Sequence, residues 1–235
     1  MENLANSFSV LELDADDSDV QPLPTSGTTG KKVNGKADTP LVNTDKQDPE
    51  NPYKLPLVWI DLEMTGLNIE VDRILEIACI ITDGNLTKSV EGPDLVIHQT
   101  KECLDRMGEW CQSHHAASGL TKRVLESTIS EREAEKQVID FVKKHVGKYT
   151  PLLAGNSIYV DLQYLKKYMP ELAGLFPHVL VDVSSVKALC IRWYPRDQKK
   201  APIKENKHRA LDDIRESIEE LRYYKANIFK PKSKK

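Results

Sequence analysis

The sequence predicts an α/β fold in which helices cover a sheet. Short apolar runs that end at turn residues come first, and helical periodicity begins near residue 130. After that point helical and strand-like segments alternate, an order that is typical of a sheet flanked by helices. No run of about 18 apolar residues occurs, so we expect no membrane-spanning helix and no membrane partner.

The first part of this region predicts strands joined by tight turns. An apolar run over 55–60 ends at an aspartate, as a buried strand would, and a second run covers 74–82. The Asp-Gly-Asn turn at 83–85 favours a hairpin into 86–91, and residues 93–98 offer a further strand. We therefore expect an antiparallel meander at one side of the sheet.

The second part predicts helices and two short strands. Ser130 and Glu133 lie within a capping box, and apolar residues follow it at helical spacing. Similar signals predict strands over 152–155 and 179–181, and helices over 161–168, 184–193 and 207–228. The last helix has apolar residues along one face, which indicates that it packs against the sheet.

Charge is unevenly distributed along the chain. The 235 residues have a net charge of −3, but residues 1–50 contain ten carboxylates and four lysines, a net charge of −6. The remaining residues are therefore mildly basic, at +3. Because residues 1–53 are polar and lack a period that could bury a face, we expect a disordered acidic tail there. An ordered domain should span 54–229, followed by a basic, flexible C-terminus at 230–235.

Two acidic residues follow the first apolar run at a spacing of two. On an extended strand, Asp61 and Glu63 would point to the same side. Two adjacent carboxylates at a buried strand end repel each other unless a charge neutralises them, and a divalent cation would do so. The alternative is that both are solvated surface acids, since this triplet alone is weak evidence.

Three further residues could carry chemistry, although each also has an ordinary structural explanation. Asp161 opens a predicted helix and could complement its dipole. Asp213 lies five residues after His208 at the start of the last predicted helix. Asp213 could be a surface acid, and His208 could simply be a residue at a helix start.

Taken together, Asp61, Glu63, Asp161, His208 and Asp213 resemble the residue set of the DEDDh 3′-to-5′ exonucleases. The surrounding sequence resembles that of the oligoribonuclease family in three segments, WIDLEMTGL (59–67), RILEIACIITDGNL (73–86) and DDIRESIEEL (212–221). The similarity runs from about residue 57 to about residue 224.

This resemblance implies a ribonuclease H-like fold with a mixed five-stranded sheet, and a homodimer. It also implies an enzyme that degrades short single-stranded RNA, down to dinucleotides, to 5′-mononucleotides. Two Mg²⁺ or Mn²⁺ ions would be held by all four acids, with Asp61 as the bridge, and would stabilise the attacking and leaving oxygens. His208 would be the general base.

The resemblance also implies residues that contact the substrate. Leu62 would wedge between two bases and Trp110 would stack on one of them, although Trp110 could equally be a core tryptophan. Stacking accepts any base, which suits an enzyme that ignores sequence. His115 and Ser157 would contact the sugar-phosphate backbone, and Ser184 would face the terminal 5′ phosphate.

One departure from the family concerns that phosphate. Many members have a His-Tyr-Arg run shortly before the Asp-Val-Ser triplet, but here His178 stands in place of the tyrosine and Val179 in place of the arginine. A bidentate phosphate donor is thereby lost. The basic stretch 192–209, with seven cations and two acids, could attract the phosphates instead, or could be an ordinary solvated loop.

Two alternatives remain for the function. The altered phosphate contact allows an exonuclease of the same class that acts on longer RNA or on single-stranded DNA 3′ ends. A non-catalytic RNA-binding module is the second alternative, but such a protein would usually lack at least one of the five site residues.

The cysteines and the start of the sequence indicate an intracellular protein. The four cysteines form no C-x-x-C pair, so they resemble neither a zinc knuckle nor a disulfide framework. No lysine or arginine precedes Lys31, which argues against a secretory signal or an Arg-rich presequence. We expect a cytoplasmic and/or nuclear protein, with mitochondria as the alternative because the family also serves organelles.

Overall fold

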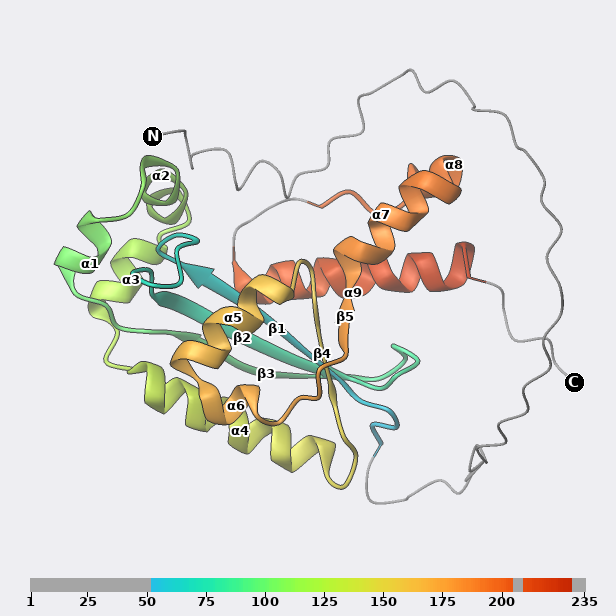
Figure 1. The fold of residues 1–235 in the computed structure, drawn as a ribbon, viewed down its shortest axis with the longest axis horizontal. Coiled ribbons are helices and arrows are strands. Elements are labelled where there is room, and N and C mark those ends of the chain that lie inside the picture. The colour runs from blue at the N-terminus through green and yellow to red at the C-terminus, as the bar shows by residue number, and fades with distance from the viewer. Residues whose placement is uncertain (1–51, 205–208, 230–235) are drawn as a thin grey trace, which may run out of the picture. The chain divides into compact units, whose positions relative to one another are not determined.

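The computed structural model describes residues 52–204 and 209–229, which belong to one unit of the chain. The acidic tail, except for its last two residues, and the basic C-terminus therefore lie outside the described residues. Within the described part the expected class is confirmed, because a mixed five-stranded sheet is flanked by helices (Figure 1).

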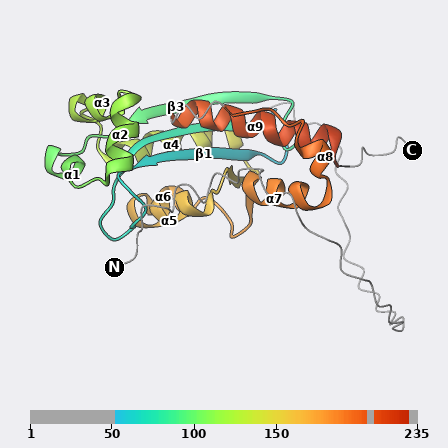
Figure 2. The same cartoon turned by 90° about the horizontal axis from the view of Figure 1, so that it is seen from above.

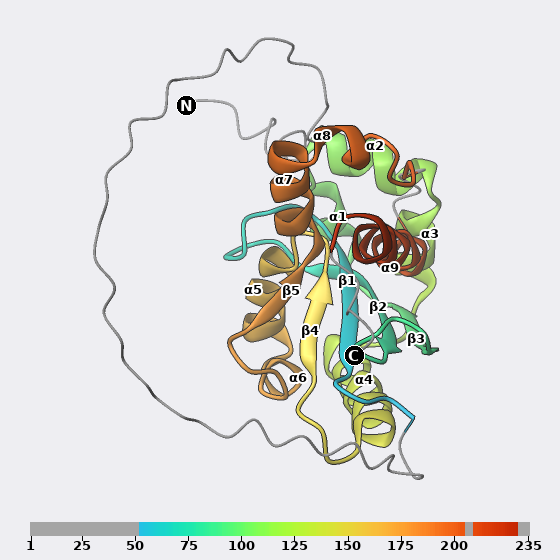
Figure 3. The same cartoon turned by 90° about the vertical axis from the view of Figure 1, so that its right-hand side faces the viewer.

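The sheet has the strand order β3-β2-β1-β4-β5, which Figure 3 shows from right to left. β1 is antiparallel to β2, and β2 is antiparallel to β3, as the predicted meander requires. β4 pairs in parallel with both β1 and β5. The strands span Leu57–Met64 (β1), Ile74–Thr82 (β2), Ser89–Val96 (β3), Leu152–Gly155 (β4) and Leu180–Asp182 (β5).

Two strands differ from the expectation. β1 continues to Met64, so the paired acids lie within the strand and not after it. The two segments expected at 86–91 and 93–98 are instead parts of one strand, β3. Its register against β2 shifts between Ala78 and Ile80. This shift falls opposite Gly92 and Pro93, and proline has no N–H to continue a regular ladder.

The longer helices agree with the prediction within one to three residues. They are α4 (Glu131–Val146), α5 (Tyr159–Tyr168), α7 (Val183–Trp193) and α9 (Ala210–Asn227). The Ser130 side chain accepts a hydrogen bond from the Glu133 backbone N–H at 3.2 Å, as the capping box predicts. Five short helices were not predicted: α1 (Lys101–Asp105), α2 (Glu109–Ala117), α3 (Leu120–Glu126), α6 (Pro170–Ala173) and α8 (Pro195–Gln198).

The two faces of the sheet bury separate hydrophobic clusters. Val58 and Ile60 of β1 belong to the cluster that contains residues of α4, α5 and α6. Trp59 points the other way and packs with α7 and α9. Figure 2 shows α8 between α7 and the C-terminal half of α9, where the Tyr223 hydroxyl donates to the Asp197 carbonyl at 2.6 Å.

The described residues bear on the expectations about membrane-spanning helices and about the cysteines. No helix there is both long and apolar enough to cross a membrane. All four cysteines are buried and free of disulfides.

We predict that Ile218→Ala lowers the free energy of unfolding by about 2–5 kcal/mol, because it removes a core side chain that holds α9 on the sheet. Ile218 is 4% exposed within the α7–α9 cluster. The matched control is Ile203→Ala, since Ile203 is 94% exposed and its truncation should cost less than about 0.5 kcal/mol. Urea unfolding followed by circular dichroism measures both values, and equal losses would contradict the packing described here.

Candidate active site

The alternation of β1 decides where its acids point. Asp61 and Glu63 lie two and four residues after Trp59, so all three lie on the side of the sheet that α9 covers. Asp213 is in the first turn of α9. One ligand oxygen of each of Asp61, Glu63 and Asp213 lies within 4.8 Å of the others. The structure thus brings together acids that are about 150 residues apart in the sequence.

Asp161 joins this group from the first turn of α5. Its side chain is 6% exposed, and one of its carboxylate oxygens accepts a hydrogen bond from the Leu62 backbone N–H at 3.0 Å. The charge of Asp161 also raises the pKa of Asp61, so the two carboxylates are close enough to repel each other. Asp161 is therefore more than a helix-dipole acid, because it is fixed against β1 beside the acidic cluster.

The pKa values of all four acids are raised. Burial is the first cause in each case, and repulsion between the acids adds to it for Asp61 and Glu63. The pKa of Asp61 lies well above its usual range, while those of Glu63, Asp161 and Asp213 are raised to about 8, about 7 and about 6.

Positive charges compensate this repulsion only in part. Lys204 lowers the pKa values of Asp61 and Asp213, and Arg209 lowers that of Glu63, but the net shifts remain upward. Four clustered carboxylates supply only oxygen ligands, which hard divalent cations prefer. The donor set and its uncompensated charge therefore fit one or more divalent metal ions.

The predicted substrate residues Ser157 and Ser184 are linked through Asp182. One carboxylate oxygen of Asp182 accepts hydrogen bonds from the Ser157 N–H (2.9 Å) and from the Ser184 N–H (2.9 Å) and hydroxyl (2.6 Å). Ser157 has a φ of 52°, a left-handed conformation that this bond supports. Sequence reasoning missed the role of Asp182, although an aspartate two residues before a serine at a helix start is a recognisable N-cap signal.

His115 and Trp110 lie on α2, a helix that the sequence did not predict. His115 is 2% exposed, its Nε2 atom is 2.9 Å from the Met64 carbonyl, and its Nδ1 atom is 3.9 Å from Glu63. Trp110 is half-buried and stacks on His114, with ring centroids 3.8 Å apart. Trp110 is thus partly accessible, and its contact with a base stays a prediction.

The remaining predicted residues differ in their surroundings. Leu62 is 5% exposed and packs in the cluster on the α4–α6 side of the sheet, so its proposed contact with bases remains a prediction. His178 and Val179 are exposed in the segment before β5. His208, the expected general base, lies outside the described residues.

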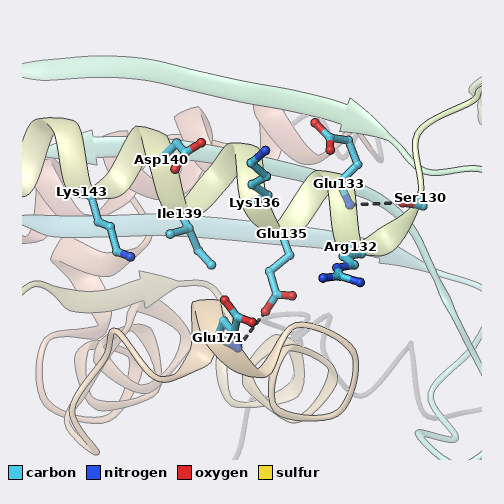
Figure 4. Close-up of a pocket in the computed structure, with 9 residues that line it drawn as sticks. All are labelled: Ser130, Arg132, Glu133, Glu135, Lys136, Ile139, Asp140, Lys143 and Glu171. Carbon is cyan, nitrogen blue, oxygen red and sulfur yellow. Dashed lines mark hydrogen bonds between the residues drawn. The ribbon is translucent and has the colours of Figure 1, made fainter.

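A surface hollow of about 480 Å³ lies elsewhere, along α4 and the start of α6 (Figure 4). None of the residues that line it belongs to the predicted site. Glu135 within it accepts hydrogen bonds from the Glu171 and Leu172 N–H groups, at 2.8 and 3.1 Å. This contact joins α4 to α6, so the buried Glu135 already has a structural role.

Comparison with known proteins identifies the family of this chain. Residues 58–221 match the RNase_T family, described as exonucleases. An oligoribonuclease from Arabidopsis thaliana is 66% identical over 230 residues, which cover 98% of this chain and 99% of that protein. A human protein named "Oligoribonuclease, mitochondrial" is 52% identical over 176 residues, 75% of this chain and 74% of its own. The oligoribonuclease of Marinobacter nauticus is 52% identical over 174 residues, 74% of this chain and 96% of its own.

Solved structures support the ribonuclease H-like fold. An Escherichia coli exonuclease I complex with single-stranded DNA has a TM-score of 0.55 at 13% identity and covers 74% of this chain. Exonuclease I of Methylocaldum szegediense has a TM-score of 0.53 at 17% identity, with the same coverage. The chain spans about two fifths of the length of these two proteins, at 41% of each. The family match, the curated relatives and the fold agree, and the chain therefore belongs to the oligoribonuclease family of exonucleases.

Proposed function

We propose that this protein is a metal-dependent 3′-to-5′ exoribonuclease that degrades short oligoribonucleotides, down to dinucleotides, to 5′-mononucleotides. The observation that carries the proposal is the convergence of Asp61, Glu63 and Asp213 within 4.8 Å, with Asp161 fixed beside them. Such a cluster has no evident structural use, because burial and mutual repulsion make it unfavourable without cations. The names of the close relatives support the choice of short RNA as substrate.

The four acids would hold two Mg²⁺ or Mn²⁺ ions. Bound divalent ions supply charge stabilisation to the attacking and leaving oxygens of a phosphodiester. With two ions bound, the four carboxylates and the ions together would have a net charge near zero, so that the phosphate is not repelled. His208, which directly precedes Arg209 in the sequence, would act as general base and take the proton from the attacking water.

Substrate contacts would be independent of base identity. The stacked pair Trp110 and His114 presents a half-buried aromatic surface on α2, close in sequence to His115 beside Glu63. Stacking on such a surface accepts every base. Ser157 and Ser184 share Asp182 as a hydrogen-bond partner, and they would contact the sugar-phosphate backbone and the 5′ phosphate.

A second candidate is an exonuclease of the same class that acts on longer RNA or on single-stranded DNA. The observation that favours it is the exposed pair His178 and Val179, which replaces the tyrosine and arginine expected near the 5′ phosphate. Weaker recognition of a terminal phosphate would lower the preference for very short chains. The high identity to proteins named oligoribonuclease makes short RNA the first choice.

We also propose that the protein is a homodimer. Three large apolar side chains at the C-terminal end of α7 are exposed: Leu189 (43%), Trp193 (65%) and Tyr194 (47%). A patch of this kind on a water-exposed helix is typical of a protein interface. A second copy of the chain is the partner that the family resemblance implies.

The compartment remains part of the proposal. We favour the cytoplasm and/or the nucleus, with mitochondria as the alternative. Relatives from human, mouse and cattle carry "mitochondrial" in their names, which gives that alternative a specific basis.

We predict that Asp61→Asn lowers the rate of dinucleotide cleavage by about a thousand-fold, because losing a metal-ligand charge removes several kcal/mol of transition-state stabilisation. The measurement is the release of mononucleotide from a labelled diribonucleotide with Mn²⁺. The matched control is Asp140→Asn on the exposed side of α4, which should retain full activity.

Excess EDTA should abolish the wild-type activity, and a twenty-nucleotide RNA should be cleaved more slowly per end than the dinucleotide. Equal activity of wild type and Asp61→Asn would contradict the proposal.

We predict that Mn²⁺ binding releases protons at pH 7 and tightens as the pH rises from 6 to 8. The pKa values of Glu63, Asp161 and Asp213, at about 8, 7 and 6, mean that the metal-free site retains protons that a metal ion must displace. Calorimetric titrations in two buffers with different ionisation enthalpies measure this proton release.

The same pKa shifts set the pH dependence of stability without metal. Because these folded-state pKa values are raised, the metal-free folded protein binds more protons than the unfolded chain. Proton binding by these carboxyl groups therefore stabilises the folded protein fully at pH values below the ordinary pKa of carboxylates. This contribution to the free energy of unfolding is lost as the pH rises toward 8. Urea unfolding without metal should show this loss between pH 5 and 8, and saturating Mn²⁺ should reverse it. Metal binding that is independent of pH would contradict both expectations.

We predict that Leu189→Glu converts the homodimer into a monomer, because it places a charge in the exposed apolar patch of α7. The matched control is Leu125→Glu, since Leu125 on α3 has nearly the same exposure, 44% against 43%. Light scattering after gel filtration should give twice the chain mass of 26.6 kDa for wild type and control, and the single mass for Leu189→Glu. A wild-type mass of 26.6 kDa would rule out the dimer.

A further inference from the structure

Glu76 is a fully buried carboxylate with an unusual position. It lies on β2 directly opposite Glu63 of β1, and its exposure is 0%. A buried charge is costly unless it is paired and hydrogen-bonded. Placing a second glutamate beside an acidic metal site raises the repulsion further, and Glu76 indeed raises the pKa of Glu63. A compensating role should therefore be visible in its contacts.

Those contacts join Glu76 to the start of α9. Arg209 donates from Nε to one carboxylate oxygen at 3.2 Å and from Nη2 to the other at 2.9 Å. The Ala210 N–H donates to the first of these oxygens at 3.3 Å. Arg123 of α3 adds an ion pair at 3.5 Å. Both carboxylate oxygens are thus used, and a two-point bond between Arg and a carboxylate fixes direction as well as distance.

The same bonds define the first turn of α9. Arg209 is the N-cap residue, and its own side chain makes no capping bond to the helix. Glu76 supplies a carboxylate from β2 instead, where the helix N-terminus favours negative charge. The Arg209 carbonyl then accepts the Asp213 N–H at 3.0 Å, so the turn that begins at Arg209 is the turn that carries Asp213.

We propose that Glu76 is a positioning residue for the metal site, which acts through Arg209 and Ala210 to place Asp213 beside Asp61 and Glu63. The inference rests on the proposed metal-dependent activity. Glu76 contacts no reacting group in this arrangement. Its role is to fix the first turn of α9 relative to the two central strands, so that acids from β1 and α9 meet at metal-binding distance.

A second ion pair on α9 provides a matched comparison. Arg215 donates to both carboxylate oxygens of Glu91 on β3, at 2.9 and 2.8 Å. This pair also joins α9 to the sheet with two bonds, but about half of each side chain is exposed. Exposed pairs contribute little to stability, and Glu91 is not opposite a site acid. If attachment of α9 to the sheet were all that mattered, the two pairs would be equivalent.

The test compares Glu76→Gln, Arg209→Lys and Glu91→Gln with wild type. Mn²⁺ affinity is measured by electron paramagnetic resonance, and kcat and KM are measured with a diribonucleotide at a temperature where circular dichroism shows each variant to be folded. We expect Glu76→Gln and Arg209→Lys to weaken Mn²⁺ binding by about ten- to a hundred-fold, with a similar fall in kcat at fixed Mn²⁺. KM should stay within about two-fold of wild type, since neither side chain is assigned to the substrate.

Rescue by metal separates positioning from general instability. Raising the Mn²⁺ concentration should restore much of kcat in Arg209→Lys, which keeps the charge but loses the two-point geometry. Glu91→Gln should match wild type in every measurement. Folded Glu76→Gln and Arg209→Lys with wild-type Mn²⁺ affinity would overturn the inference, as would an equal loss in Glu91→Gln.

The outcomes also distinguish this inference from the proposed function. If Glu76→Gln does not fold, Arg209→Lys decides, because the Arg209 side chain is 27% exposed and its replacement leaves no cavity in the core. Wild type that is active while both variants are unaffected would overturn the positioning role alone. Wild type that neither binds Mn²⁺ nor cleaves the dinucleotide would overturn the proposed function, and the inference with it.

Discussion

Repulsion among buried carboxylates is the constraint on which the rest of this structure depends. Burial raises the pKa values of Asp61, Glu63, Asp161 and Asp213, and repulsion from the other site acids raises those of Asp61 and Glu63 further. Apolar packing holds them together. On the same face of β1 as Asp61, Trp59 is completely buried against α9, and its indole N–H donates to Thr82 of β2 at 3.0 Å. Burial of the apolar side chains in this cluster thus offsets the unfavourable free energy of bringing the carboxylates together.

Positive charges near the site are themselves restrained by acids. Arg209 is engaged with Glu76, and Lys204 donates to Ser217 and pairs with the buried Glu220 at 3.2 Å. Both cations lower the pKa values of nearby site acids, but the net shifts remain upward. The acidic cluster therefore keeps an excess of negative charge, which suits a divalent cation.

Local sequence signals predicted the parts of the fold that are long or regular. Alternation along β1 placed Asp61 and Glu63 on one side, and the capping box at Ser130 marked the start of α4. Helices α1, α2 and α3 have five to nine residues, too few turns for a clear apolar period, so Trp110 and His115 were placed by resemblance and not by pattern. The N-cap contact of Asp182 with Ser184 is local and could have been recognised. Its bond to Ser157 and the bond of Glu76 to Ala210 join residues 25 and 134 positions apart, which no local pattern encodes.

The order in which the site is assembled along the chain has a consequence for synthesis. Asp61 and Glu63 emerge early, Asp161 follows about 100 residues later, and Asp213 arrives with α9, the last described helix. A nascent chain that ends before α9 has the strands of the sheet but lacks one of the acids and the helix that covers them. With Asp213 as the proposed metal ligand, the nuclease site is incomplete until translation has passed this helix.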